Sequence, residues 1–141
     1  MAIEVRPDNW PLGSGYSHGF SAAGRLVFVA GQIGWDPITQ AVTPGLVEQT
    51  RQALANVVAV LRAGGAKPSD LVRLTWFITD REAYLRDRQA VGAAYRDVIG
   101  RHFPPMSVIV VAGLLEPGAL VEIEATAVIP AATDQDNSSG A

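Results

Sequence analysis

The sequence predicts an α+β fold in which one mixed β-sheet is covered on one face by two helices. Two long segments place apolar residues at three- and four-residue intervals, as amphipathic helices do. Shorter segments are rich in β-branched residues or alternate between apolar and polar residues, as strands do. The order of these segments is β-β-α-β-α-β-β. Since each predicted helix has a single apolar stripe, packing both helices on one face of a single sheet is the simplest layered arrangement.

The composition indicates one small domain that buries part of its surface against other copies. The chain has 141 residues, of which 48% are hydrophobic, and its mean hydropathy is +0.18. We expect a single domain over residues 1–130 and a disordered, polar tail over residues 131–141. No third helix is predicted to cover the second face of the sheet. Burial of that face in an oligomer is therefore expected.

Charge and residue types exclude several classes of function. Eleven Lys and Arg residues against 14 Asp and Glu residues give a net charge of −3, and the basic residues are scattered, so no nucleic-acid partner is expected. The chain has no cysteine, which excludes disulfides and thiolate metal sites, and its two histidines lack matching carboxylates for a metal site. There is neither a signal-peptide pattern nor an apolar run of about 18 residues, so we expect no membrane partner and a cytoplasmic location.

The first half of the chain is predicted to hold a strand pair and a helix. An edge strand is expected at Ile3–Arg6. Strands at Ser17–Ala22 and Leu26–Ala30, joined by a turn, are expected to form a hairpin. The helix is predicted over Leu46–Ala63, with Thr43 as its N-cap. Its exposed face is expected to carry five polar residues, namely Glu48, Arg51, Gln52, Asn56 and Arg62.

The second half is predicted to hold a strand, a helix and a second hairpin. The strand is expected at Leu71–Thr79 and the helix at Glu82–Ile99, with Gly100 after it. Two apolar strands, Ser107–Val111 and Ala119–Val128, are joined by a segment rich in Gly and Pro. We expect these two strands to pair with each other.

Two glutamates on the last strand are the first candidates for chemistry. Val121, Ile123 and Ala125 alternate with Glu122 and Glu124, so the glutamates share the other face of the strand. A carboxylate in a half-buried cleft is suited to acid or base catalysis. The alternative is a carboxylate paired across a subunit boundary. Glu124 is expected to be structural or solvated.

Aromatic and basic residues near the predicted strands are further candidates, each with a structural alternative. Tyr16 is a candidate to hydrogen-bond a ligand, or it lies on an apolar edge with its hydroxyl in water. His18 follows on the same side of an extended strand and offers a titrating group, although a surface histidine is the more common outcome. Trp35 is a candidate wall of the pocket. Arg25 and Arg73 are candidates to bind an anionic group of a ligand. The alternative is that they face solvent or form ion pairs at an interface.

Five segments follow one another in the chain without large gaps: GRLVFVAGQIGWDPITQAV, EQTRQALANVVAVLRAGGAKPSDLVRLTWFITD, AYRDVI, FPPMSVIVV and GALVEIEATAV. Through these segments the chain resembles the RidA/YjgF family of reactive-intermediate deaminases over roughly residues 14–129. The resemblance implies a chorismate-mutase-like subunit, a homotrimer with ligand clefts between subunits, and hydrolysis of imines or enamines. It also implies that no metal or organic cofactor takes part.

The family's site residues carry over only in part. The resemblance implies that Tyr16 and Glu122 are catalytic, and that Gly31 and the backbone N–H of Ser107 contact the substrate. Two positions depart from the family pattern: Ala30 replaces a serine, and Met106 replaces the arginine that forms a forked pair with the substrate carboxylate. Because methionine supplies no donor, a 2-imino acid would leave its carboxylate unpaired in the cleft. We therefore predict weak activity on 2-aminoacrylate.

Two hypotheses of function follow. The first is a small cofactor-independent hydrolase or deaminase acting on an imine, enamine or related C–N metabolite, with Met106 shaping the pocket and His18 and Trp35 beside the substrate. The second is a non-catalytic trimer that uses the same clefts to bind a small ligand, because two expected polar groups are missing. The sequence does not specify the substrate.

Overall fold

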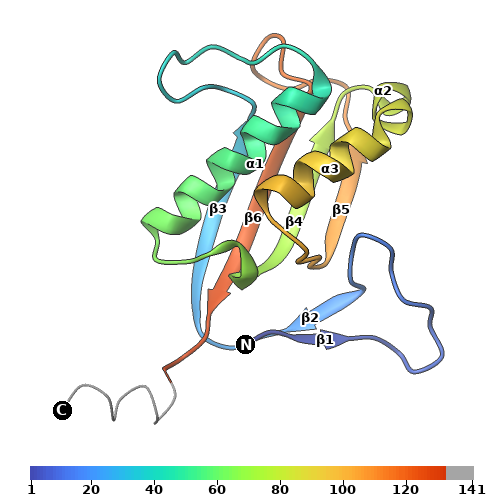
Figure 1. Cartoon of the computed structure of the whole chain (residues 1–141), viewed down its shortest axis with the longest axis vertical. Helices are drawn as coiled ribbons and strands as arrows, with labels where there is room; N and C mark the ends of the chain where they lie inside the picture. Colours follow the sequence, from blue (N-terminus) through green and yellow to red (C-terminus); the bar gives the residue numbers. More distant parts are fainter. Residues whose placement is uncertain (133–141) are drawn as a thin grey trace.

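The computed structural model describes residues 1–132 and confirms the α+β class with a mixed sheet (Figure 1). Four strands form this sheet in the order β3-β6-β4-β5, where β3 is Arg25–Ile33, β6 is Val121–Ile129, β4 is Leu71–Ile78 and β5 is Met106–Val110. β6 is antiparallel to both of its neighbours, β3 and β4, whereas β4 and β5 are parallel.

The helices lie on one face of the sheet, as Figure 1 shows. They are α1 (Leu46–Ala63), α2 (Arg81–Arg86) and α3 (Arg88–Val98), and a short 3₁₀ turn, η1 (Pro68–Asp70), precedes β4. The apolar stripe of α1 packs on the sheet through residues such as Leu54, Val57 and Leu61, all fully buried. The core therefore lies between α1, α3 and the inward residues of β4 and β6.

The first predicted hairpin is wrong in its pairing. β2 (Gly19–Ser21) pairs antiparallel with β1 (Ile3–Val5) in a separate two-stranded sheet, and it does not pair with β3. β3 instead pairs along nearly its whole length with β6. Burial explains this choice, because the inward residues of β3 and β6 enclose the core with α1, while β1 is exposed along its length.

The second predicted hairpin is also wrong. β5 and β6 follow one another in the chain, but β4 lies between them in the sheet. β4, the helices and β5 form a strand–helix–strand unit with parallel strands, which requires a long crossover rather than a tight turn. Residues 111–120 therefore cross from one edge of β4 to the other and reach the start of β6.

The second predicted helix is divided in two, and the N-cap of the first is a different residue. Asp87 separates α2 from α3, and the side chain of Asp80 caps α2 by accepting from Ala83 N at 3.0 Å. α1 has the predicted bounds, but Gly45 is its N-cap. The backbone N–H of Thr43 instead donates to the carbonyl of Gly34 at 2.8 Å, which fixes the loop before the helix.

The sheet face away from the helices is open in the single chain. Phe28 on β3 is 72% exposed, Leu26 51% and Ile109 on β5 44%. The register places Glu122, Glu124 and Thr126 of β6 on this same face, because their neighbours in the strand point into the core. We call it the open face.

Two sequence-based expectations concern membranes and the tail. Within residues 1–132, none of the helices combines the length and apolar character needed to cross a lipid bilayer. The predicted disordered tail covers residues 131–141, and residues 133–141 lie outside the described part of the chain.

Candidate functional site

Glu122 lies against Gly31, and the two residues touch across neighbouring strands. A Cβ atom placed on Gly31 would be 2.1 Å from Oε1 of Glu122 and 2.8 Å from its Cδ. The carboxylate is half-buried, and no ion pair joins it to a cation of residues 1–132. The glycine thus leaves the space in which the carboxylate lies at the surface of the open face.

A bulge in β3 creates this approach. The β3–β6 register shifts between Val29 and Gln32, so Ala30 and Gly31 both lie opposite Glu124. Gln32 Nε2 donates to the carbonyl of Ala30 at 3.2 Å, within the bulge. Ala30 is exposed on the open face and lines a shallow hollow with Phe28 and Arg73. The bulge brings Gly31 beside Glu122.

Buried Gln49 on α1 fixes the start of β6, and the sequence patterns did not identify it. Its Nε2 donates to the carbonyl of Gly118 at 2.9 Å, and its Oε1 accepts from the N–H of Leu120 at 2.7 Å. Gly34 packs on its backbone, since a Cβ at position 34 would be 2.6 Å from Gln49 Cα. Gln49 therefore holds the segment that leads into Glu122.

Asn56, also on α1, holds the backbone at the end of β3 in a similar way. The prediction that Asn56 lies on the exposed face of the helix is wrong. Asn56 is 5% exposed, and its Nδ2 donates to the carbonyls of Ile33 at 3.2 Å and Trp35 at 2.9 Å. Asn56 follows Gln49 by seven residues, about two helical turns, so both lie on one side of α1. That spacing of two amides beside an apolar stripe is the signal that would have found them.

Trp35 is placed near Glu122 by this network. It follows β3 and bridges to Val42 across the turn that contains Asp36. The side chain of Asp36 accepts from the N–H groups of Ile38 and Thr39 at 2.7 and 3.2 Å, which makes the predicted Asp-Pro turn. Trp35 is half-buried and lines a hollow at this end of the sheet.

Tyr16 and His18 form an aromatic group at the other end of the sheet. The His18 ring packs edge-on against Tyr16 at 5.5 Å and against Trp10 at 5.2 Å. His18 Nε2 lies 3.0 Å from the carbonyl of Pro11, and Tyr16 is 41% exposed. The backbone of Ser17 between them is held by Pro104 O at 3.5 Å, next to the start of β5.

Met106 and Ser107 begin β5 and point to opposite faces. Met106 is opposite Leu74 and packs against the core from the helix side. Ser107 is opposite Thr75, is exposed, and lies on the open face with the glutamates. Glu122 is in register with Phe77 on β4 and, through it, with Ile109 on β5. Ile109 is three residues after Met106, so Glu122 and Met106 are offset along the strands by roughly 10 Å.

The candidate residues therefore form two groups within one chain. Gly31, Trp35 and Glu122 lie where β3 ends and β6 begins. Tyr16, His18, Met106 and Ser107 lie where β5 begins, next to the β1–β2 pair (Figure 1). The structure of a single chain does not bring the two groups together.

Neither candidate arginine lies beside Glu122. Arg25 Nη2 donates to the carbonyl of Gly64 at 3.0 Å and so caps the end of α1. Arg73 is on the open face, opposite Thr126, whereas Glu122 is opposite Phe77. Arg73 and Phe77 are four residues apart on β4, so Arg73 and Glu122 are offset along the strands by about 13 Å.

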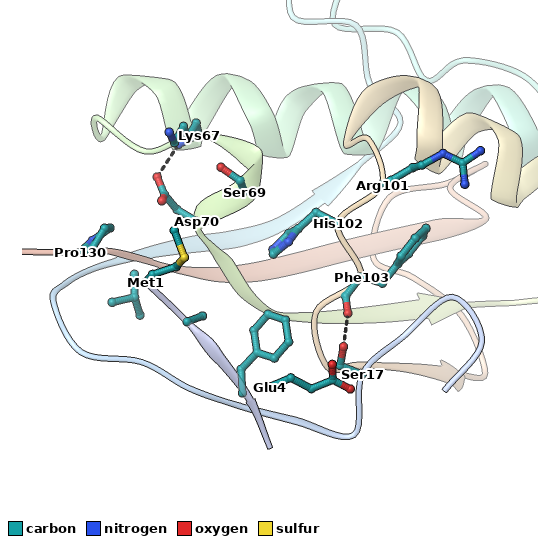
Figure 2. A pocket seen from close by; sticks show the side chains of 13 residues that line it. Met1, Glu4, Ser17, Lys67, Ser69, Asp70, Arg101, His102, Phe103 and Pro130 are labelled. Atoms are coloured by element: carbon teal, nitrogen blue, oxygen red, sulfur yellow. Dashed lines mark hydrogen bonds between the residues drawn. The ribbon is translucent and has the colours of Figure 1, made fainter. Parts of the chain in front are cut away.

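A separate hollow lies between the β1–β2 pair and the start of β4 (Figure 2). Figure 2 shows His102 and Ser17 inside it, and both are engaged with backbone: His102 Nε2 lies 2.8 Å from Leu71 O, and Ser17 Oγ donates to Phe103 O at 2.6 Å. Tyr95 OH donates to His102 O at 2.5 Å. These contacts join elements together, and the hollow contains none of Gly31, Trp35 and Glu122.

Within residues 1–132, no three His, Asp or Glu side chains are grouped in a way that would hold a metal ion.

The fold and the glutamate beside a bulge glycine define a small α+β protein with a polar site on an open sheet face. The family model described as Endoribonuclease L-PSP matches residues 11–129. The 2-iminobutanoate/2-iminopropanoate deaminase of Salmonella typhimurium is 37% identical over 132 residues, which cover 91% of this chain and 98% of that protein. The human protein of the same name is 33% identical over 105 residues, or 74% and 73% of the two chains.

Solved structures of similar proteins match most of this chain. A protein of unknown function of the Rid family from Yersinia pestis matches with a TM-score of 0.78 at 32% identity, over 91% of this chain and 98% of that one. E. coli TdcF with bound serine matches with a TM-score of 0.66 at 31% identity, over 90% and 98%. The chain belongs to the RidA/YjgF family.

Proposed function

We propose that this protein is a cofactor-independent hydrolase that acts on the C=N bond of an imine, or of the imine tautomer of an enamine, without an α-carboxylate. The observation that carries the proposal is the Glu122 carboxylate, half-buried, without an ion-pair partner in residues 1–132, and placed in the space left by Gly31. Relatives over nearly the whole chain are named imine deaminases, which supports the type of reaction.

Glu122 acts on the attacking water. It accepts a proton from the water as the water oxygen bonds to the imine carbon, and it passes this proton to the imine nitrogen, which gives a neutral carbinolamine. Glu122 then takes the hydroxyl proton of the carbinolamine and delivers it to the nitrogen as the C=O bond forms and the C–N bond breaks. The products are a carbonyl compound and ammonia, and no electrons are exchanged. The backbone N–H groups of Gly31 and Ser107 and the hydroxyl of Tyr16 hold the substrate.

The proposal includes a homotrimer whose clefts join the two groups of residues. Within one chain, Glu122 is near the start of β6, whereas Tyr16 precedes Ser17, whose N–H donates to the carbonyl of Pro104 just before β5, so the proposal needs a neighbouring copy to bring them together. The exposed apolar side chains of the open face, Leu26, Phe28 and Ile109, supply surface for such contacts.

The lack of an α-carboxylate follows from position 106. The family resemblance implies an arginine at this position, and a forked pair of arginine with a carboxylate uses charge-assisted hydrogen bonds of about 1.5–3 kcal/mol each. Met106 offers no donor and packs on the core.

We do not expect this chain to act as an endoribonuclease. The net charge is −3, and basic residues are scattered along the sequence. Binding of a phosphate backbone depends on clustered Lys and Arg side chains.

The test is turnover of a panel of imines by the wild type and by Glu122→Ala, with the oligomeric state of both proteins measured by light scattering. The proposal expects turnover of carboxylate-free imines that Glu122→Ala abolishes without a change of assembly. It also expects little acceleration when serine dehydratase supplies 2-aminoacrylate. Stabilisation of the protein by ligands without turnover of any compound would instead identify a binding protein, the alternative favoured by Ala30 and Met106.

A further inference from the structure

A hollow lies at the end of β3, and one of its lining residues, Ile33, is the strand neighbour of Glu122. Ile33, the last residue of β3, is directly opposite Glu122 in the antiparallel register, so the two side chains share a face about 5 Å apart. Trp35 is two residues further and bridges to Val42. The hollow is lined by Ile33, Trp35, Gln40, Val42 and Glu116.

The walls of this hollow are held from behind by buried hydrogen bonds. Asn56 donates to the carbonyls of both Ile33 and Trp35, and Gln52 Nε2 donates to Asn56 Oδ1 at 2.9 Å. Because these bonds fix the backbone of two lining residues, the hollow is preorganised. Glu116 comes from the β5–β6 loop, which Figure 1 shows at the same end of the sheet as the β3–α1 loop.

Gln40 also lines the hollow, and its backbone conformation is strained. Its φ is 60°, in the left-handed region, and it is the one non-glycine residue of the described chain with a positive φ. Its N–H donates to the carbonyl of Asp36 at 2.7 Å, which closes the turn. Such a conformation persists where the surrounding contacts determine it, as they do at ligand sites.

The chemistry of the lining selects against an anion. Three of the five lining side chains are apolar, one is an amide, and one is a carboxylate, with no cation among them. Glu122 adds a second carboxylate next to Ile33. An apolar group gains by leaving water here, whereas a negative group would meet only like charge.

We propose that Ile33, Trp35 and Val42 form the substrate-side-chain subsite of this enzyme, and that it takes an aryl or branched hydrocarbon group attached to the imine carbon. This inference rests on the proposed function, and it names the substrate class as uncharged apolar aldimines or ketimines. The reaction is R–CH=NH plus water giving R–CHO plus ammonia. R occupies the subsite while the carbon lies at Glu122, because Ile33 is the direct neighbour of that residue.

The test uses two probes of nearly equal shape, benzamide and benzoate, in ligand-observed NMR titrations of the wild-type protein. Benzamide presents an aryl group next to an uncharged C–N unit, and benzoate replaces that unit with a carboxylate. We expect benzamide to bind at least about tenfold more tightly than benzoate. Trp35→Ala and, separately, Val42→Ala should weaken benzamide by about tenfold or more. Ile38→Ala, in the same turn and 92% exposed, is the matched control and should leave binding within about twofold.

The outcomes separate the subsite from the proposed catalysis. Tighter binding of benzoate, or unchanged benzamide binding in folded Trp35→Ala and Val42→Ala, would overturn the subsite. If benzamide binds as expected but the enzyme hydrolyses no imine, the subsite stands and the hydrolase proposal fails. Thermal unfolding of each variant shows that it is folded before its titration is interpreted.

Discussion

The carboxylate of Glu122 fills the space in which any other residue at position 31 would place its Cβ atom, 2.1 Å from Oε1. Gly31 is in a β-bulge and Glu122 is near the start of β6, so this contact joins two strands at the open face. The position of the carboxylate therefore depends on the absence of a side chain at residue 31.

Gly31→Ala should displace Glu122 and lower kcat/KM for a carboxylate-free imine by about tenfold to a hundredfold, since misplacement of a catalytic group by about 1 Å has effects of that size. Steady-state kinetics with a purified amine oxidase as the imine source measure it. Gly113→Ala is the matched control, because a Cβ there meets no atom within 4 Å. Equal loss in both variants would show that the contact with Glu122 is not the cause.

Met106→Arg should raise kcat/KM for 2-iminopropanoate by about tenfold to a hundredfold, because a forked pair with the carboxylate becomes available. The aliphatic stem of arginine can occupy the partly buried position of Met106 with its guanidinium in water. Met106→Lys, which supplies a point charge without the fork, should gain less. A wild-type rate on 2-iminopropanoate equal to that of the Arg variant would contradict the role assigned to this position.

Gln49→Leu should destabilise the protein by about 2–4 kcal/mol, because the carbonyl of Gly118 and the N–H of Leu120 each lose a partner worth about 1–3 kcal/mol. Urea unfolding gives the value. Gln89→Leu, on exposed α3 surface, should stay within about 0.5 kcal/mol of the wild type. Similar stability of the two variants would mean that Gln49 does not hold the start of β6.

Tyr95 should make stability fall at high pH. Burial raises the pKa of the Tyr95 phenol well above its ordinary value of 10.0, so the folded protein keeps a proton that the unfolded chain loses. Its contribution is fully present below about pH 10 and is lost as pH rises above that value. Urea unfolding from about pH 9 to about pH 11 should show a steeper loss for the wild type than for Tyr95→Phe. Equal slopes would contradict this assignment.

The elements that could be predicted are those with strong local signals. α1 has the predicted bounds because its apolar stripe is regular and Gly64 follows it. Strand pairing could not be predicted in the same way, because an apolar strand such as β5 carries no local mark of its partner. Its parallel partner β4 is set by the helical crossover and by burial of the sheet on α1 and α3.

The candidate site could also be predicted only in part. Glu122 could be named from strand alternation, and the family resemblance named Gly31, but the bulge that brings the two together is a property of the β3–β6 register. Gln49 and Asn56 escaped prediction because polar side chains on a helix usually face water, whereas these two satisfy loop carbonyls and an N–H next to the site.

The rate of hydrolysis of a carboxylate-free aryl imine by the wild type and by Glu122→Gln measures the role of this carboxylate most directly. Glutamine keeps the size of the side chain but cannot accept the proton of the attacking water. We expect Glu122→Gln to lose at least about a hundredfold in kcat, with the fold and the oligomeric state unchanged. Equal rates for the two proteins would contradict it.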